Sequence, residues 1–536
     1  MSTLARPPAR AQDQVPIADR HRHRGSLVVA LVVVAVVSLV LHFWSSSPLW
    51  LDEAQSVAIA RLPLHGAATT MWTGLRQDGS PPLYYLLLHF WTLAFGDGAR
   101  AVRALSGAMS VASFPLLWLL GRRVAGTRVV TASVLLFATS PFAVRFATET
   151  RMYSLLVLLA ILGGLALHRA LTDGPRPLSI IALAVVSGGL ALTHYWSFYL
   201  LGTLAAGLAV AAWRAPSRRR VCLWALFGVA AGAVLFVPWL PNFFYQLAHT
   251  GTPWGRPQNL SAVVSTFGQW AGGASPAGRF LLVVIAALLV LAVFAAPVDE
   301  RRVVLDLAGR EPGRLLLALT LGTLVLAVFA GQVTGNAWAD RYTAAAFVPF
   351  LLVAGLGIRP LAYRLGVGFM AVACVLGLIA SRPEVVTPRT QAGDVAKIVN
   401  RMARPGDIVV TCPDQLGPAL ARLVRPDVAV LGAPTLQGAA RVDWVDYATR
   451  QEHAAPYTVV NQALQRVGSQ GTVFLALAGG YRTYESLCGN LASGLQQARP
   501  SGGNLTTDNA TIYEHEGLDI FPPSDASAGG AVPRPG

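Results

Sequence analysis

Charged residues are scarce in this chain, and their scarcity excludes an ordinary soluble enzyme. Only 13% of the 536 residues are Asp, Glu, Lys or Arg, and 54% are hydrophobic, whereas charged residues make up about 25% of a typical soluble domain. Lysine occurs once, at Lys397. The net charge is +15, but the arginines stand in short clusters between apolar runs, so no nucleic-acid partner is expected. The composition indicates a polytopic membrane protein.

Cysteine is also rare, and motifs for metals and nucleotides are missing. The chain has four cysteines and neither a CxxC nor an HxxxH pattern, which argues against a structural zinc site. No Gly-rich loop resembles a phosphate cradle, so no nucleotide is expected. Cys222 and Cys374 fall in apolar runs and are predicted to be core residues. Cys412 and Cys488 fall in a polar region where an oxidising compartment permits a disulfide, but the sequence leaves their pairing open.

About eleven apolar stretches are long enough to cross a bilayer, since a helix of about 20 residues covers the roughly 30 Å hydrocarbon core. The first stretch lies too far inside the chain for a cleaved signal peptide and has no small-residue cleavage site after it, so we expect it to remain as an anchor. The predicted spans are 26–44, 101–120, 129–147, 154–171, 178–193, 198–213, 221–238, 280–296, 315–333, 344–358 and 365–380.

The arginine clusters fall on alternate connections between these spans. Positively charged residues favour cytoplasmic loops, so a cytoplasmic N-terminus places every cluster inside. The same assignment puts residues 50–100, 146–151, 194–195, 242–279, 335–342 and everything after 381 outside. We therefore expect a multi-pass protein of the plasma membrane with its C-terminal region outside the cytoplasm.

Near residue 383 the apolar runs give way to a soluble pattern. Short strand candidates at 407–411, 427–431 and 471–477 alternate with helical stretches near 392–402, 415–423, 459–467 and 484–498, which predicts a small α/β domain. The expected organisation is a cytoplasmic tail (1–25), a helical membrane domain (26–382) with a large first outer loop (45–100), an extracytoplasmic α/β domain (383–520) and a Pro/Gly/Ala/Ser-rich disordered tail (521–536).

The first outer loop carries acids that packing does not explain. Asp52 and Glu53 directly follow the first span, and Asp78 precedes Pro81 and Pro82. Desolvating a carboxylate costs several kcal/mol unless it is paired or used. A structural role is the alternative for the first two, because acids near a helix start satisfy free backbone donors. The apolar stretch after the prolines is too short to span, and spanning would also break the charge alternation, so we expect an interfacial or re-entrant helix.

Two further polar segments lie on the same predicted side. The first contains Arg145, Glu149, Arg151 and Tyr153, which could form a salt-bridged clasp. Alternatively, Arg151 binds a phosphate and Glu149 holds an acceptor or a metal.

Arg341 and Tyr342 stand at the outer start of the tenth span, and His194 stands in the third outer loop. Interfacial anchoring is the alternative for all three residues. Together with the acids of the first loop, these segments suggest a site for an anion at the outer leaflet.

Taken in order, these segments resemble the family 39-like branch of the C-class (GT-C) membrane glycosyltransferases, which includes protein O-mannosyltransferases and the aminoarabinose transferase of lipid A. The resemblance covers roughly residues 51–358, and Ser80 departs from the usual His-Pro-Pro motif. Arginine in place of lysine, with abundant Ala and Gly, indicates a high-GC, actinobacterial source. The motifs are Leu51-Asp-Glu-Ala, Pro81-Pro-Leu-Tyr-Tyr, Glu149-Thr-Arg-Met-Tyr, Thr193-His-Tyr, Pro238-Trp-Leu-Pro and Asp340-Arg-Tyr.

The resemblance implies an inverting enzyme that moves a sugar, with mannose first among the candidates, from a polyprenyl phosphate to an envelope glycolipid, glycan or protein. It puts Asp52 in the catalytic centre as the base. Members of the family differ in metal use, so a divalent metal stays open, with Asp52, Asp78 and Glu149 as candidate ligands. The residues expected to bind substrate are Glu53, Asp78, Glu149, Arg151, Tyr153, His194, Arg341 and Tyr342.

Two other classes of protein compete with this interpretation. A transporter or flippase for a lipid-linked saccharide also needs apolar helices and anion-binding residues, but transporters place ionisable groups near the bilayer midplane and often show a repeat, and neither feature is found here. A non-catalytic envelope-assembly protein is the third possibility. Retention of full biological function by an Asp52 variant would favour either of these over an enzyme.

Overall fold

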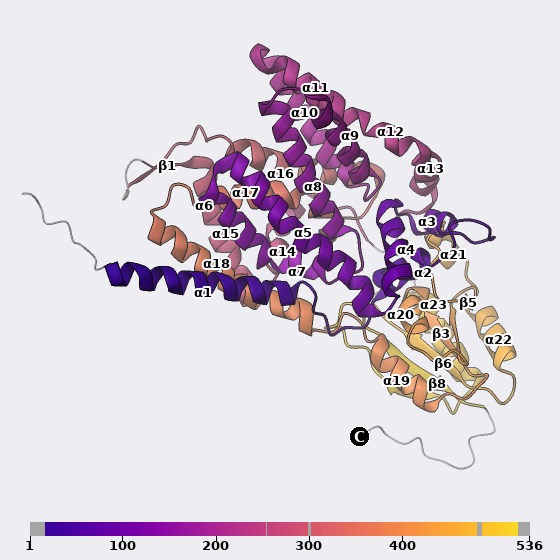
Figure 1. The fold of residues 1–536 in the computed structure, drawn as a ribbon. Coiled ribbons are helices and arrows are strands. Elements are labelled where there is room, and N and C mark those ends of the chain that lie inside the picture. Colours follow the sequence, from indigo (N-terminus) through magenta and orange to yellow (C-terminus); the bar gives the residue numbers. More distant parts are fainter. Residues whose placement is uncertain (1–16, 253–254, 298–301, 480–484, 524–536) are drawn as a thin grey trace, which may run out of the picture.

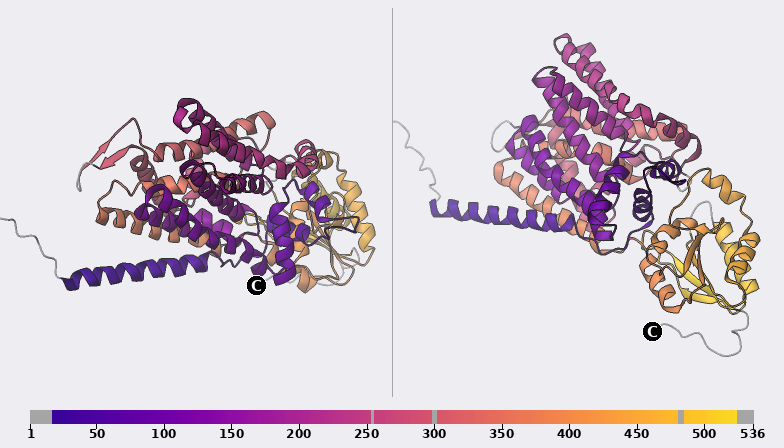
Figure 2. Two further views of the ribbon diagram at one scale, coloured as in Figure 1. Left: turned by 45° about the horizontal axis from the view of Figure 1, so that its top comes forward. Right: turned by 45° about the vertical axis from the view of Figure 1, so that its right-hand side comes forward.

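The computed structural model describes residues 17–252, 255–297, 302–479 and 485–523 (Figure 1). A bundle of helices forms the larger part, and a smaller α/β domain packs against one end of it. The segment that carries α2, α3 and α4 lies between the two parts in all views (Figures 1 and 2). The predicted fold class, a polytopic helical membrane protein with a C-terminal α/β domain, is confirmed.

The helices of the bundle follow the predicted apolar runs. They are α1 (Ile17–Leu41), α5 (Ala99–Ala125), α6 (Thr127–Ala138), α7 (Pro141–Ala147), α8 (Tyr153–Thr172), α9 (Pro177–Ala191), α10 (Ser197–Arg214), α11 (Arg219–Ala231), α12 (Ala233–Phe236), α13 (Leu240–His249), α15 (Pro276–Phe294), α16 (Gly313–Thr334), α17 (Ala344–Leu356) and α18 (Tyr363–Val386). The short β1 (Ala295–Pro297) and β2 (Val303–Leu305) pair antiparallel between α15 and α16.

All eleven predicted runs are helical, but they differ in length. Among the described residues, seven helical segments are long and apolar enough to cross a membrane, and the bent pair α6 and α7 makes an eighth. The other three runs are shorter: the described apolar part of α1 is Val29–Leu41, α9 has 15 residues, and α17 has 13. All 13 residues of α17 are buried, so this helix forms the centre of the bundle.

Helices α6 and α7 form one bent pair. The two helices meet at 57°. Ser140 caps α7, and its side chain accepts a hydrogen bond from the Ala143 N–H at 3.3 Å, while Pro141 is the first residue of α7. Proline has no N–H to continue the hydrogen bonds of the preceding helix but suits the start of a new one. The turn after α7 then carries Glu149 and Arg151.

The segment predicted as the first outer loop folds into α2 (Leu51–Ala60), α3 (Met71–Asp78) and α4 (Leu83–Phe95). Asp52 and Glu53 both lie in the first turn of α2. Thr70 caps α3, and α4 begins directly after the two prolines. With 13 residues, α4 is about 20 Å long, short of the hydrocarbon core, which agrees with the predicted non-spanning helix. Helix α14 (Ser261–Trp270) packs against α7, α15 and α16, with Trp270 buried in the core of the bundle.

The α/β domain is built on a six-stranded sheet with the order β5-β4-β3-β6-β8-β7. Strand β3 runs parallel to β4 and β6, and β8 runs antiparallel to β6 and β7. The strands are β3 (Ile408–Cys412), β4 (Ala429–Gly432), β5 (Gln437–Gly438), β6 (Val473–Leu477), β7 (Gly503–Thr506) and β8 (Gly517–Phe521), and the helices are α19 (Ala392–Met402), α20 (Gly417–Ala421), α21 (Tyr447–Glu452), α22 (Pro456–Val467) and α23 (Glu485–Ala498). Short 3₁₀ turns at Pro216–Arg218, Val237–Trp239, Asp340–Thr343 and Asp414–Leu416 complete the described elements.

Helices cover both faces of this sheet. Ile408 and Val410 of β3 pack in the cluster that includes α22 and α23, whereas Val409 packs in the cluster that includes α19 and α20. Successive strand residues point to opposite faces, so a central strand that is covered on both sides reads as a continuous apolar run. That run is the pattern from which β3, β4 and β6 were predicted.

Several predicted boundaries differ from the structure. Helix α18 ends at Val386, four residues past the expected boundary, with Pro383 inside it. Phe521, assigned to the tail, is the last residue of β8. Helix α1 begins at Ile17, inside the predicted cytoplasmic tail, and residues 1–16 of that tail lie outside the described residues. Residues 524–536 of the predicted disordered tail also lie outside them.

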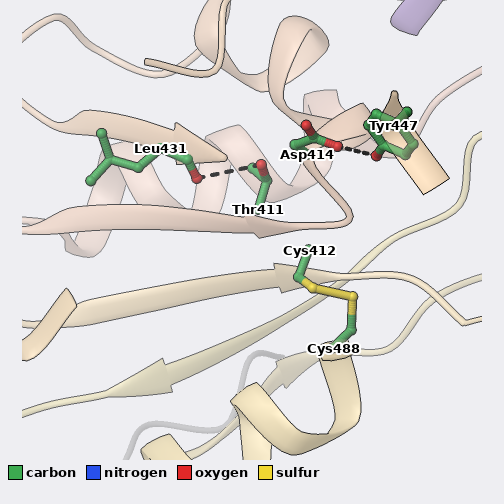
Figure 3. The surroundings of a disulfide bond; sticks show 6 residues. All are labelled: Thr411, Cys412, Asp414, Leu431, Tyr447 and Cys488. Carbon is green, nitrogen blue, oxygen red and sulfur yellow. Dashed lines mark hydrogen bonds between the residues drawn. A yellow bond between two sulfur atoms is a disulfide. The ribbon is translucent and has the colours of Figure 1, made fainter. Parts of the chain in front are cut away.

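The disulfide left open by the sequence is present. Cys412, at the end of β3, is bonded to Cys488 in α23 (Figure 3). The bond ties the sheet to a helix across a sequence separation of 76 residues. Cys222 and Cys374 are free and buried, as predicted.

Removing this disulfide is expected to destabilise the α/β domain. Cross-linking a loop of this length restricts the unfolded chain, which corresponds to about 3–5 kcal/mol of stability. We expect the double variant Cys412→Ser, Cys488→Ser to melt at lower temperature and to be cleaved faster by protease after residue 387. Cys222→Ser is the matched control, and equal melting of the two variants would contradict the prediction.

Candidate active site

A cavity of about 280 Å³ opens at the end of the bundle that faces the α/β domain, close to the lower end of the range for small-molecule sites. The polar part of its wall comes from segments far apart in the sequence, and an aromatic part comes from the starts of α10 and α13. The polar lining includes Asp52, Gln55, Asp78, Ser80, Arg151, His194, Gln246, Arg341 and Tyr342, and the aromatic lining includes Tyr195, Trp196, Phe198, Tyr199, Phe243 and Trp444.

Asp52 lies in the first turn of α2 with its carboxylate between two arginines. Its Oδ2 atom is 3.8 Å from Arg151 Nε and 3.7 Å from Arg341 Nη2. The side chain is 16% exposed, and Oδ2 is buried without a hydrogen-bond partner among the described residues. A buried carboxylate oxygen that accepts no hydrogen bond from the protein is available to accept one from a bound hydroxyl.

Arg151 is held in place by two hydroxyl groups. Its Nη1 atom donates to Ser56 Oγ and to Tyr85 Oη, both at 3.0 Å. Ser56 lies one helical turn after Asp52, so α2 carries both the acid and one support of the arginine. Because both acceptors are neutral, the negative charge near Arg151 comes from Asp52 and Asp78 in the cavity wall.

Arg341 comes from the turn before α17 and reaches Asp52 from the other side. Its Nη1 atom donates to Tyr513 Oη at 3.0 Å, and the guanidinium lies 5.9 Å from the centre of the Trp50 ring. The adjacent Tyr342 packs its ring 4.8 Å from that of His194. Two guanidiniums therefore face one cavity, which is an arrangement suited to a phosphate.

Asp78 also lines the cavity, but its oxygens are occupied. Gln55 Nε2 donates to Oδ1 at 2.6 Å, and Tyr85 Oη donates to Oδ2 at 2.8 Å. Since Tyr85 also accepts from Arg151, the four side chains of Gln55, Asp78, Tyr85 and Arg151 form one chain of hydrogen bonds along the wall. This arrangement fixes the shape of the wall and leaves Asp52 as the cavity acid without such bonds among the described residues.

His194 is a neutral member of the site. Burial lowers the pKa of His194 to about 3, with Arg151 and Arg341 adding to the shift. Its Nδ1 atom accepts a hydrogen bond from the Trp196 N–H at 3.1 Å, so the proton resides on Nε2. A neutral imidazole of this kind donates one hydrogen bond but supplies no positive charge to a phosphate.

Glu53, predicted to bind substrate, faces away from the cavity. Arg103 donates from Nε to Oε1 at 2.7 Å and from Nη2 to Oε2 at 2.5 Å, and the Thr150 N–H donates to Oε1 at 2.9 Å. Burial raises the pKa of Glu53, but Arg103 and Arg389 outweigh it and the net pKa is lowered. With no exposed surface, Glu53 holds α2 to α5 and to the turn before α8.

Replacing Glu53 is therefore expected to cost stability. Breaking a buried ion pair by removing one partner costs about 3–5 kcal/mol, because the other charge stays buried. We expect Glu53→Gln to lower the melting temperature strongly. Asp97→Asn is the matched control, since Asp97 pairs with Arg61 at 2.6 Å on the surface, where such a pair contributes about 0–1 kcal/mol. A melting temperature of Glu53→Gln equal to that of the control would contradict this role.

Glu149 and Tyr153 also lie outside the cavity lining. Glu149 is buried and accepts from Arg145 Nε at 2.9 Å, which is the ion pair of the clasp alternative. Tyr153 is fully buried, with its ring 5.9 Å from His194. It supports the cavity wall from behind.

The candidate metal ligands do not gather into a metal site. Among the described residues, no group of three or more His, Cys, Asp or Glu side chains is placed to hold an ion. Glu149 pairs with Arg145 away from the cavity, and the oxygens of Asp78 are occupied. The side chains next to the Asp52 carboxylate are the arginines Arg151 and Arg341, and a guanidinium does not ligate cations. The described residues around the cavity therefore do not fit a divalent metal.

Several residues of the site were not predicted from the sequence. Arg103 and Arg389 surround Glu53, Gln55 joins Asp78 to the α/β domain, and Trp444 lines the cavity. Arg103 carried a usable signal, because a lone arginine within an apolar run needs a buried partner. Gln55 and Trp444 gave no such signal, because their partners lie far along the chain.

Comparison with known proteins gives a family match over part of the chain and a fold match over nearly all of it. Residues 79–241 match the family described as dolichyl-phosphate-mannose-protein mannosyltransferase. No curated protein matches the chain significantly. The crystal structure of ArnT from Cupriavidus metallidurans in the apo state is similar with a TM-score of 0.60 and 14% identity, covering 95% of this chain and 100% of that one.

The same enzyme bound to undecaprenyl phosphate gives a TM-score of 0.57 and 14% identity, covering 95% of this chain and 99% of that one. The archaeal oligosaccharyltransferase AglB from Archaeoglobus fulgidus, in complex with an inhibitory peptide and a dolichol-phosphate, gives 0.45 and 11% identity, covering 84% and 69%. At these identities the similarity to ArnT establishes the fold. The GT-C architecture expected from the sequence motifs is confirmed.

Proposed function

We propose that this protein is an integral membrane glycosyltransferase that transfers a sugar from a polyprenyl phosphate to an acceptor hydroxyl, with inversion at the anomeric carbon. The observation that carries the proposal is the Asp52 carboxylate, which lies in the cavity wall between Arg151 and Arg341. Displacement of a phosphate leaving group requires a base for the attacking hydroxyl and positive charge for the phosphate, which the carboxylate and the two arginines supply. The partial family match and the ArnT-like fold support the same reaction class.

In the proposed reaction, the acceptor hydroxyl attacks the anomeric carbon from the face opposite the phosphate. Asp52 takes the hydroxyl proton as the new C–O bond forms. The bond between the anomeric carbon and the phosphate oxygen breaks, and its electron pair stays with that oxygen. Polyprenyl phosphate thereby gains one negative charge, which Arg151 and Arg341 stabilise. His194 remains neutral and donates one hydrogen bond.

The walls of the cavity suit a lipid-linked donor at the outer leaflet. Aromatic residues at the starts of α10 and α13 supply apolar lining, and Asp52, Asp78, Arg151 and Arg341 supply charged lining. A prenyl chain is apolar and its phosphate is anionic, so the two kinds of lining match the two parts of one molecule. We place this end of the bundle outside the plasma membrane, with the N-terminus in the cytoplasm, following the arginine alternation.

The direct test is transfer from a labelled donor. Membranes that contain the protein are incubated with radiolabelled polyprenyl-phosphate mannose, and products are separated into lipid, glycan and protein fractions. We expect label to appear in one fraction, which identifies the acceptor class, and not in membranes without the protein. Other polyprenyl-phosphate sugars are tested in parallel, since mannose rests on the family match. Movement of donors across the bilayer without any product would favour a flippase instead.

Transfer is expected to continue after metal removal. Because the side chains that face the Asp52 carboxylate are arginines, which do not ligate metal ions, EDTA at millimolar concentration should change the initial rate less than twofold. The control is the same membranes with added Mg²⁺ or Mn²⁺. A loss of more than tenfold with EDTA, restored by a divalent ion, would contradict the arginine-only assignment.

A further inference from the structure

The α/β domain touches the site through the loop between β7 and β8. The backbone of Glu514 is fixed at the junction of the two parts, because its N–H donates to Arg389 O at 2.9 Å and its carbonyl accepts from Gln391 N–H at 3.0 Å. Arg389 in turn donates to Thr148 O at 2.6 Å. Residues 513–514 are therefore anchored both to their own domain and to the bundle.

Glu514 binds the start of the helix that carries Asp52. Its Oε2 atom accepts a hydrogen bond from the Leu51 N–H at 2.7 Å, and the side chain is 2% exposed. Trp50, the N-cap residue of α2, makes no side-chain capping bond. The first N–H groups of a helix need an acceptor from elsewhere. Glu514 supplies one across 463 residues of sequence.

Glu514 is suited to this place as a neutral group. Burial raises the pKa of Glu514 well above its usual value, and the nearby Glu516, Asp52 and Glu53 add to the shift. A protonated carboxyl keeps an acceptor oxygen for Leu51 without placing a further negative charge beside Asp52. Glutamine has the same shape and the same acceptor, and it is the natural mimic of this state.

Tyr513 contacts the other half of the site. Its hydroxyl accepts from Arg341 Nη1 at 3.0 Å. Its ring meets the Trp50 ring edge-on, with centroids 5.1 Å apart, and the Arg341 guanidinium lies over that same Trp50 ring. Tyr513 thus holds Nη1 of the Arg341 guanidinium, while Nη2 lies near Asp52.

We propose that Tyr513 and Glu514 are positioning residues of the active site: Glu514 holds the first turn of α2 and thereby the Asp52 carboxylate, and Tyr513 orients the Arg341 guanidinium. The C-terminal domain is then part of the catalytic apparatus and not only an appended module. The catalytic consequence rests on the proposed glycosyltransferase function, whereas the holding of α2 does not.

The test compares three variants and one control in the full-length protein. Tyr513→Phe removes one hydrogen bond to a charged group and is expected to lower kcat about tenfold with little change in donor KM. Glu514→Ala should lower kcat at least as much, and Glu514→Gln should stay within about twofold of wild type because it keeps the acceptor. Tyr457→Phe is the matched control, since Tyr457 and Tyr513 are both 61% exposed in the same domain.

Hydrogen exchange provides a readout that does not depend on transfer. The segment from Trp50 to Gln55 should exchange faster in Glu514→Ala than in wild type, and equally in Glu514→Gln and Tyr457→Phe. If wild type transfers no sugar, the proposed function fails while the exchange result still decides whether Glu514 holds α2. If Glu514→Ala does not fold, Tyr513→Phe decides by its kcat. Unchanged exchange in Glu514→Ala, or unchanged kcat in Tyr513→Phe, would overturn the corresponding assignment.

Discussion

Replacing Asp52 by asparagine is expected to lower the rate of sugar transfer by a factor of about 10²–10⁴, the contribution of a positioned general base. Asparagine keeps the size of the side chain but cannot take the acceptor proton. The loss should appear in kcat, because donor binding depends on the arginines and the apolar wall. Initial rates at saturating donor, in membranes matched for the amount of folded protein, measure it.

Two variants separate chemistry from folding in this experiment. Asp52→Glu keeps a carboxylate but moves it by one methylene, so it should retain a small fraction of activity. Asp97→Asn changes an acid at the other end of the same outer segment, in a surface pair with Arg61, and should transfer normally. A rate for Asp52→Asn within a few-fold of wild type would remove Asp52 as the base.

Replacing Arg341 by glutamine is expected to lower kcat by about 10²–10³, the usual effect of removing one preorganised group that stabilises developing charge. The charge on the leaving phosphate grows during the reaction, so Arg341 matters more in the transition state than in the bound donor. Arg341→Lys should recover part of the loss, because lysine keeps the charge but not the planar fork.

The control for this series is an arginine far from the site. Arg314→Gln removes a half-exposed residue that pairs with Glu311 near the start of α16, and it should leave kcat unchanged. The effects of Arg341 and Asp52 variants are not expected to add, because the two side chains lie 3.7 Å apart and share one network. A loss of affinity for donor with unchanged kcat would assign Arg341 to ground-state binding only.

Much of the architecture could be predicted because membrane physics limits the options. Apolar length and the alternation of arginine clusters located eleven helical runs and assigned the outer segments to one side. The structure brings Asp52, Asp78, Arg151, His194 and Arg341 of those segments to one cavity. Lengths were less predictable: α17 is short because it is buried on all sides and has no lipid-facing surface to match.

Which acid faces the cavity could not be read from the sequence. Asp52 and Glu53 are neighbours, but successive residues on a helix point about 100° apart, so one enters the cavity and the other enters the core. The ion pair with Arg103 of α5 shows that Glu53 is the acid in the core. Strands β7 and β8 were missed because Gly503–Thr506 and Gly517–Phe521 lack a run of β-branched residues. Missing them also concealed Tyr513 and Glu514, which lie between them.

The configuration of the transferred sugar is the most direct test of a single displacement at the anomeric carbon with Asp52 as base. A donor of defined anomeric configuration is used, and the product linkage is determined by NMR or by linkage-specific glycosidases. A single displacement predicts complete inversion in wild type and only trace product, also inverted, in Asp52→Asn. Retention of configuration would exclude a single displacement from the face opposite the phosphate and would contradict the proposal.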